Sequence, residues 1–261
     1  MSPLQAVLWD VDGVIAESER DGHRVAFNQA FEAVGLSWRW DEARYGDLLR
    51  IAGGRQRLLH DMTLRSDAPA TADERQMLAQ ELHRRKNHHF ADLVLGGGVP
   101  LRPGVRELMD ECCARGVRMG IVTTTSRINA DALLQVHLGP RWPQRFATIV
   151  CGEDVARRKP DPEGYARALR ELGLGPLQVV ALEDSPGGVA AARAADIPVV
   201  VPRSAYFADA SIEGAVAIGP GLHTREGWRP ALRPDPAGDG PVRVDDLQAW
   251  CAEMDTISQF H

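Results

Sequence analysis

The sequence predicts an α/β protein in which helices cover both faces of a parallel sheet and a second, helical unit is inserted near the amino terminus. Four short apolar runs, each followed by polar residues, are typical of strands buried on both faces. These runs are residues 6–9, 119–122, 179–182 and 198–201. Amphipathic helical patterns separate most of the runs, and this alternation predicts a Rossmann-like core.

The inserted unit is predicted from residues 20–95, which carry helical patterns and no good strand. Apolar side chains between Phe27 and Val34 share one helical face, and this helix is expected to end at Gly35. A long charged helix is expected through residues 81–90. The Gly-Gly-Gly run that follows it, before Val99 and Pro100, is typical of a flexible hinge.

These signals divide the chain into two units. The core is predicted to comprise residues 1–17 and 98–261, and the helical cap residues 18–97. Linkers near residues 16–22 and 94–101 would let the cap close over the core.

Three helices of the core are predicted from apolar spacing and from end signals. Residues 104–116 bury one apolar face and are expected to end at a glycine. Residues 161–173 are expected to begin with Asp161 as the cap and Pro162 in the first helical position. Residues 186–195 are expected to form a third helix, whose small side chains allow close packing on the sheet.

The carboxyl-terminal part of the chain is less regular in its pattern. Residues 219–241 are rich in glycine and proline and are expected to be irregular. Residues 242–252 are expected to add a last strand and a helix.

Composition excludes several classes of protein. A net charge of -6 argues against a general nucleic-acid binder, and no apolar run approaches the roughly 18 residues that span a membrane. The first residues lack the pattern of a signal peptide, so a cytoplasmic protein is expected. No obligate protein partner is predicted. The cysteines lack C-x-x-C spacing and are expected to be reduced thiols: Cys112, Cys113, Cys151 and Cys251.

Polar side chains stand at the carboxyl ends of the predicted strands, where ligands bind in open parallel sheets. Asp10 and Asp12 follow the first run, Thr123 follows the second, and Glu183 and Asp184 follow the third. Carboxylates brought so close repel one another unless a cation lies between them, and Mg²⁺ prefers such oxygen ligands. The sequence therefore predicts a magnesium site formed by these four carboxylates.

The same edge of the sheet predicts phosphoryl chemistry. Asp10 is placed to attack phosphorus and form an aspartyl-phosphate. Asp12, two residues on, can protonate the leaving oxygen and then activate water. Lys159 can stabilise the negative charge of the transition state. Hydroxyl groups that could hold the remaining phosphate oxygens follow the second strand, at Thr124, Thr125 and Ser126.

These motifs resemble those of the haloacid dehalogenase superfamily of phosphotransferases. Its four motifs occur here in order: D-x-D-G at Asp10, the apolar strand ending at Thr123, the pair Lys159-Pro160, and Glu183-Asp184-Ser185. The resemblance implies a Mg²⁺-dependent enzyme with this fold and a small helical cap.

A closer resemblance is to CbbY-type phosphatases of xylulose-1,5-bisphosphate. Its marks are residues 19–28, 40–41, 45–49, 53–57 and 101–104. It implies that the ligand is a small phosphorylated sugar. It also implies that cap residues contact the sugar and its distal phosphate, namely Glu19, His23, Arg55 and Arg57, with Gly54 allowing the backbone to approach.

The sequence departs from this pattern at several places. Trp9 stands where many relatives have Phe, and Val14 replaces the common Thr. One extra residue separates Glu19 from His23, compared with the Glu-x-x-His pattern of the best-known bacterial members. This insertion leaves the role of His23 open.

Other functions stay open from the sequence. A β-phosphoglucomutase would use the same aspartyl-phosphate but return it to a sugar, and a phosphoglycolate phosphatase would prefer a small acid. A phosphonate hydrolase would need a cap lysine such as Lys86. A sugar-phosphate sensor without turnover would be expected to lack Asp10 or Asp12, and both are present.

Some conspicuous residues have a simpler interpretation. His83, Lys86, His88 and His89 are expected to lie on a solvated helix face, with Lys86 the one candidate for substrate contact. Trp38 and Trp40 are expected to pack inside the cap.

Overall fold

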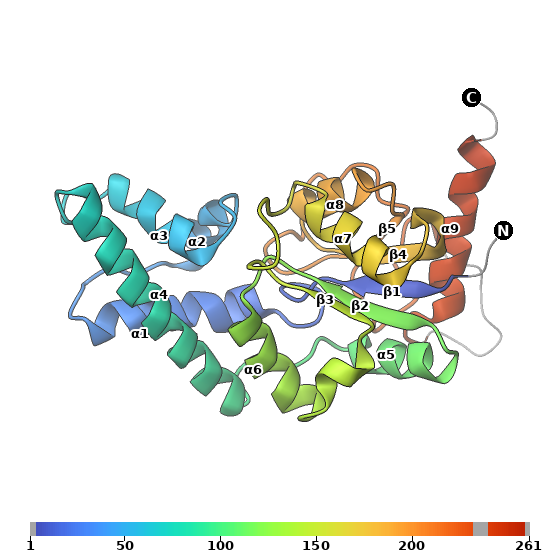
Figure 1. The fold of residues 1–261 in the computed structure, drawn as a ribbon, viewed down its shortest axis with the longest axis horizontal. Helices are drawn as coiled ribbons and strands as arrows, with labels where there is room; N and C mark the ends of the chain where they lie inside the picture. Colours follow the sequence, from blue (N-terminus) through green and yellow to red (C-terminus); the bar gives the residue numbers. More distant parts are fainter. Residues whose placement is uncertain (1–3, 232–239, 259–261) are drawn as a thin grey trace.

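The computed structural model describes residues 4–231 and 240–258, and these contain a six-stranded parallel sheet (Figure 1). The strands are β1 (Ala6–Trp9), β2 (Arg118–Val122), β3 (Thr148–Val150), β4 (Val179–Leu182), β5 (Val199–Pro202) and β6 (Ala217–Gly219). They lie in the order β3-β2-β1-β4-β5-β6. The predicted α/β class with a parallel sheet is confirmed.

Strand β1 lies between β2 and β4 and fixes where the site forms. Its Trp9 is level with Ile121 of β2 and with Leu182 of β4. The chain therefore leaves all three strands at the same edge of the sheet. Because successive strands are added on one side of β1 and then on the other, this edge is also the topological switch point, where such sheets bind ligands.

Alternate side chains of the sheet pack on opposite layers of helices, because successive residues of a strand point to opposite faces. The core helices are α5 (Val105–Ala114), α6 (Arg127–Leu138), α7 (Glu163–Leu172), α8 (Pro186–Arg193) and α9 (Val244–Ser258), with short helical turns η2 (Trp142–Arg145) and η3 (Pro176–Gln178). Val7 and Trp9 pack with α5, α6 and α9, whereas Ala6 and Leu8 pack with α7 and α8. Figure 1 shows α7 and α8 on one side of the sheet and α5 and α6 on the other.

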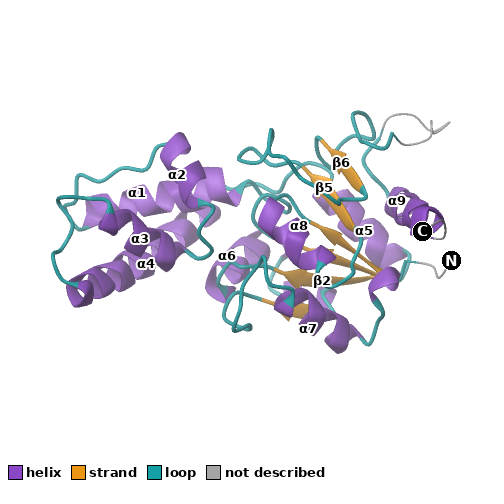
Figure 2. Cartoon of the chain, turned by 90° about the horizontal axis from the view of Figure 1, so that it is seen from above, coloured by secondary structure: helices purple, strands orange, loops and turns teal. Residues whose placement is uncertain are grey.

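The chain between β1 and α5 forms a separate helical unit, which lies beside the sheet in Figure 2. It consists of a helical turn η1 (Ser18–His23), α1 (Arg24–Ala33), α2 (Glu42–Leu48), α3 (Gly54–Thr63) and α4 (Ala72–Leu95). Its own apolar cluster buries Phe27, Trp38 and Trp40, so the expected packing of the two tryptophans is confirmed. Helix α4 begins at a capping box between Thr71 and Glu74.

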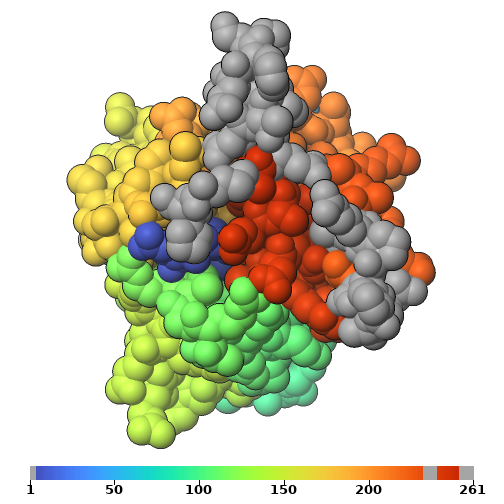
Figure 3. Space-filling view, turned by 90° about the vertical axis from the view of Figure 1, so that its right-hand side faces the viewer, coloured from blue at the N-terminus to red at the C-terminus, as the bar shows by residue number. Residues whose placement is uncertain are grey.

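Helix α9 covers the end of the molecule remote from the helical unit. Figure 3 shows it next to α5 and next to the residues that lead into β1. The Val244 amide donates to the Glu111 carboxylate at 3.1 Å, and Arg115 pairs with Asp245 at 2.6 Å. A helix in residues 242–252 is thus confirmed. The expected strand there is wrong: Val242 forms a backbone hydrogen bond to Leu222 at 2.8 Å but lies in none of the strands.

Two strands were not predicted. β3 and β6 have three residues each, too few to show a period of two. Helix α7 starts at Glu163, with Pro162 as the capping residue, one position later than expected. In the stretch expected to be irregular, residues 219–241, Gly219 still belongs to β6. Residues 220–231 contain no helix or strand, and residues 232–239 lie outside the described part. None of the helices described is long and apolar enough to cross a membrane.

Candidate active site

Asp10 is held at the end of β1 by the sheet and by Lys159. Its backbone amide donates to Leu182 at 3.0 Å, which extends the ladder by one residue. The Lys159 ammonium donates to the Asp10 carboxylate at 2.8 Å, to Glu183 at 2.5 Å and to the Val122 carbonyl at 2.7 Å. Three strand ends and one lysine therefore converge on one point.

Three buried carboxylates meet beside this lysine. Ligand oxygens of Asp10, Glu183 and Asp184 all lie within 4.8 Å of one another. Burial raises the pKa of Asp10 to about 7, against the opposing effect of Lys159. Burial also raises the pKa of Asp184 well above its usual value, and Asp10 and Glu183 add to the shift. Crowded, buried acids of this kind are stabilised by a divalent cation.

Two glycines lie where any side chain would collide with these carboxylates. A Cβ atom on Gly13 would come within 1.9 Å of an Asp184 oxygen, and one on Gly188 would come equally close to a Glu183 oxygen. Gly13 also has a φ of 83°, which favours glycine. The donor set and its surroundings thus fit Mg²⁺. The Asp12 carboxylate, predicted as a fourth ligand, is not part of this group.

The Asp12 carboxylate instead faces the helical unit. It accepts a hydrogen bond from Ser18 at 2.5 Å and lies 3.2 Å from Nε2 of His23. Burial would raise the pKa of Asp12, but His23 and Ser18 outweigh burial and hold it well below its usual range. His23 is itself buried. Its ring centroid lies 4.2 Å from that of Phe90, with the two rings tilted by 34°, and Thr125 Oγ1 lies 3.4 Å from its Nε2. His23 therefore lies against the Asp12 carboxylate, despite the extra residue before it.

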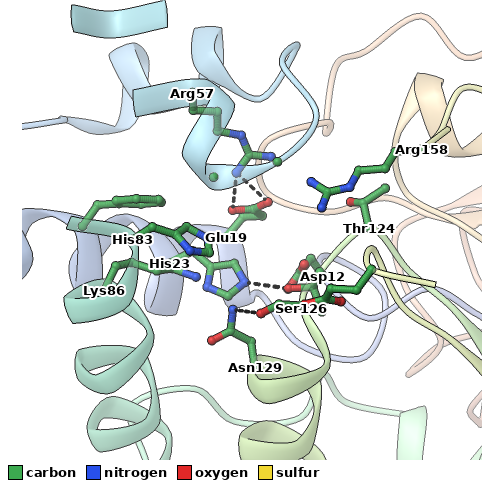
Figure 4. Close-up of a pocket in the computed structure, with 15 residues that line it drawn as sticks. Asp12, Glu19, His23, Arg57, His83, Lys86, Thr124, Ser126, Asn129 and Arg158 are labelled. Carbon is green, nitrogen blue, oxygen red and sulfur yellow. Dashed lines mark hydrogen bonds and ion pairs between the residues drawn. The ribbon is translucent and has the colours of Figure 1, made fainter. Parts of the chain in front are cut away.

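A second group of charged residues lies across the cleft, on the helical unit (Figure 4). Arg57 is buried and donates to Glu19 at 3.2 Å and to the Tyr45 hydroxyl at 3.1 Å. The Tyr45 hydroxyl donates to Glu19 at 2.5 Å. Lys86 is also buried, with its ammonium near the Phe27 and Phe90 rings. Burial lowers the pKa of Lys86 to about 8.

Two adjoining cavities connect the carboxylates with these cations. One, of about 230 Å³, is lined by Asp10, Lys159 and Asp184. The other, of about 80 Å³, is lined by His83 and Lys86, with Arg158 and Asn129 opposite. Both are lined by Asp12, Glu19, Arg57 and Thr124. The two form one cleft, acidic at the end of the sheet and rich in cations towards the helices.

Some of the other predicted residues line the cleft, and others do not. Thr124, Thr125, Ser126 and Gly54 line the smaller cavity. Thr123 is buried and lines neither cavity, but its hydroxyl accepts from the Thr125 amide at 3.2 Å and so braces that loop. Arg55 is exposed and lines neither cavity.

Sequence reasoning missed four polar residues that line the smaller cavity: His83, Asn129, Glu153 and Arg158. The solvated interpretation is wrong for His83, which is half-buried and lines the smaller cavity, whereas His88 is exposed as expected. Lys86, the expected candidate for substrate contact, is buried on the inner face of α4 and lines the same cavity. A signal was present: Lys86 lies four residues after Leu82 and four before Phe90, both buried. Arg158 stands next to Lys159 in the sequence, so it was a candidate for a second cation in the cleft.

A family model described as haloacid dehalogenase-like hydrolase matches residues 4–196. The chain belongs to this family. Protein CbbY, plasmid, of Cupriavidus necator is similar to this hydrolase, at 42% identity over 99% of the chain and 97% of that protein. A phosphoglycolate phosphatase of Rhodospirillum rubrum is 32% identical over 90% of the chain and 94% of that protein.

Solved structures extend the comparison. A variant of CbbY from Rhodobacter sphaeroides, in complex with xylulose-(1,5)bisphosphate, superimposes with a TM-score of 0.75 and 36% identity. The match covers 81% of this hydrolase and 92% of that chain. The resemblances seen in the sequence, to the superfamily and to CbbY proteins, are therefore confirmed.

Proposed function

We propose that this enzyme, a phosphatase, removes a phosphate group from a sugar bisphosphate, with xylulose-1,5-bisphosphate as the preferred substrate. The observation that carries the proposal is that the two ends of the cleft differ in charge. The acidic end, with Lys159, suits the reacting phosphate, and Arg57, Lys86 and Arg158 suit a second one. The CbbY relatives, one of which binds this sugar bisphosphate, support the choice of substrate.

The catalytic steps follow from the carboxylates. An Asp10 oxygen bonds to phosphorus while the bond from phosphorus to the sugar oxygen breaks, and Asp12 delivers a proton to that oxygen. Water then loses a proton to Asp12, attacks the phosphorus and releases phosphate, which restores the Asp10 carboxylate. Mg²⁺ held by Asp10, Glu183 and Asp184 would supply positive charge for the developing transition state.

Asp12 and His23 are proposed to share the moving proton. Asp12 is held ionised in the structure, so it must take up a proton before it can act as an acid. His23 Nε2, at 3.2 Å, is positioned to supply the proton and to take it back when water is activated. This assigns His23 to proton transfer in addition to the sugar contact implied by the family resemblance.

The helical unit is proposed to act as a cap, over residues 18–97, that brings its cations to the distal phosphate. Glu19 and Arg57 reach the cleft from it. Closure would expel bulk water, which strengthens these charge interactions.

The test is phosphate release with Mg²⁺ from a panel of substrates. The panel comprises xylulose-1,5-bisphosphate, ribulose-1,5-bisphosphate, fructose-1,6-bisphosphate, β-glucose 1-phosphate and phosphoglycolate. We expect a kcat/KM for xylulose-1,5-bisphosphate about 100-fold above the rest. A flat profile would contradict that substrate and leave a general phosphatase.

The R. rubrum relative favours phosphoglycolate phosphatase as a second candidate. Phosphoglycolate also carries two anionic groups, but they are closer together than those of a sugar bisphosphate. A preference for phosphoglycolate in the panel would select this candidate. Interconversion of sugar phosphates without net phosphate release would select a mutase.

Lys86 predicts a pH dependence of substrate binding. Because the pKa of Lys86 is lowered to about 8, its charge is present below pH 8 and is lost as the pH rises through that value. We expect KM for the bisphosphate to rise by up to about tenfold per pH unit between pH 8 and 9, with little change in kcat. Steady-state kinetics from pH 7 to 9 measure this.

The matched control is Lys86→Arg, since arginine stays charged throughout this range. Its KM should be nearly independent of pH, whatever its absolute value. A wild-type KM that stays constant up to pH 9 would show that Lys86 does not contact the substrate.

A further inference from the structure

We propose that Tyr206, on the loop after β5, is a positioning residue that holds the substrate-binding groups of the helical unit in register with the core. The inference rests on the proposed function, because the groups that it positions are those assigned to the distal phosphate. Tyr206 belongs to the sheet-bearing part of the chain, yet it packs with the apolar cluster of the helical unit. Every other member of that cluster, among the residues described, lies between Phe27 and Leu82.

The contact is made by the aromatic ring. The Tyr206 and Tyr45 rings lie 5.8 Å apart between centroids, tilted by 53°. Gly46 leaves the space that the ring occupies, because a Cβ atom there would come 3.3 Å from it. Helix α2 therefore presents the Tyr45 ring to the core loop and, at Gly46, a gap. The Tyr206 ring packs against Tyr45 and lies in this gap. Aromatic pairs of this geometry are favourable beyond their buried area.

The loop that carries Tyr206 is braced from the core. The Arg203 guanidinium donates to the carbonyls of Phe207 at 2.8 Å and Ala210 at 3.0 Å, which closes the loop on itself. The Ala205 amide donates to the Glu17 carboxylate at 3.2 Å. Glu17 stands in the first linker, so the loop is also bound to the segment about which the helical unit would move. These hydrogen bonds therefore hold the loop, and Tyr206 with it, in one position.

The contact leads directly to the cleft. Tyr45 is fully buried, and its hydroxyl donates to Glu19 and accepts from Arg57. A shift of the Tyr45 ring would therefore move both charged groups. Phe207, next to Tyr206, lines the larger cavity of the same cleft. Small errors in the placement of substrate-binding groups lower catalytic efficiency, because only a narrow range of substrate orientations is productive.

The test compares two variants on two substrates. Tyr206→Ala removes the ring, and we expect at least a tenfold rise in KM for xylulose-1,5-bisphosphate. Hydrolysis of p-nitrophenyl phosphate, which has no distal phosphate, should stay within twofold of wild type. Tyr206→Phe keeps the ring and should restore the bisphosphate KM to within about twofold. An equal loss on both substrates, or no change in either, would overturn the proposal.

A second measurement does not depend on turnover. Hydrogen–deuterium exchange of peptides covering α2 and η1 should be faster in Tyr206→Ala than in wild type, and unchanged in Tyr206→Phe. Equal exchange in all three proteins would overturn the positioning role. A wild-type protein that releases phosphate from none of the substrates contradicts the proposed function instead, and the exchange result then decides the role of Tyr206 alone.

Discussion

Replacing Asp10 by asparagine is expected to lower kcat for phosphate release by on the order of 10⁴-fold or more. The amide cannot form the aspartyl-phosphate, because it lacks the anionic oxygen that attacks phosphorus. Lys159, Glu183 and the cations of the helical unit remain in Asp10→Asn, so substrate should still bind. Phosphate release and calorimetric binding of the bisphosphate measure the two effects separately.

The thermal midpoint is the control for this variant. Burial already disfavours the charged form of Asp10, as its pKa of about 7 indicates, so loss of the carboxylate should not lower the midpoint. Phosphate release at the wild-type rate would refute the nucleophile assignment. Loss of both turnover and binding, with an unchanged midpoint, would mean that Asp10 mainly holds the cation.

Replacing Lys159 by methionine has the second largest expected effect. Lys159 is the cation that neutralises Asp10 and Glu183 in the structure, and under the proposed function it would contact the reacting phosphate. Loss of one such group from a transition state costs about 10²- to 10³-fold in kcat. Breaking a buried ion pair also costs about 3 kcal/mol, which corresponds to a fall of roughly 5–10 °C in the thermal midpoint.

The double variant Lys159→Met, Glu183→Gln separates the two effects. It removes one of the carboxylates that Lys159→Met leaves without a partner, so part of the thermal midpoint should return. Activity should not return, since the lysine charge is still missing. Recovery of kcat in the double variant would show that Lys159 acts only through stability. Differential scanning fluorimetry and phosphate release decide between these outcomes.

The acidic end of the cleft was predictable because its geometry is local. Asp10, Asp184 and Lys159 follow directly after short strands or stand in a compact motif, and parallel strands bring such ends together. The packing of alternate residues of β1 against opposite helical layers follows from the same regularity. For these residues, the strand pattern and the local motifs were enough to predict their place in the site.

The cation-rich end depended on packing that the sequence does not display. Lys86 enters the cleft only because α4 turns it towards α1 and η1, and a lysine in a charged helix more often faces solvent. Arg158 lines the smaller cavity from the other side, on the core. The Asp12 carboxylate turns to His23 and Ser18, which are six or more residues away, so its absence from the acidic cluster could not be read from the motif.

The position of β1 has a consequence for synthesis on the ribosome. Of the six strands described, β1 emerges first, but its partners β2 and β4 end at residues 122 and 182. At roughly 5–20 residues per second, the apolar segment Ala6–Trp9 waits about 10–35 seconds for its second neighbour. The helices between β1 and β2 make mainly local contacts and form on a shorter time scale. The nascent chain is therefore expected to hold an ordered helical unit while its central strand is still unpaired.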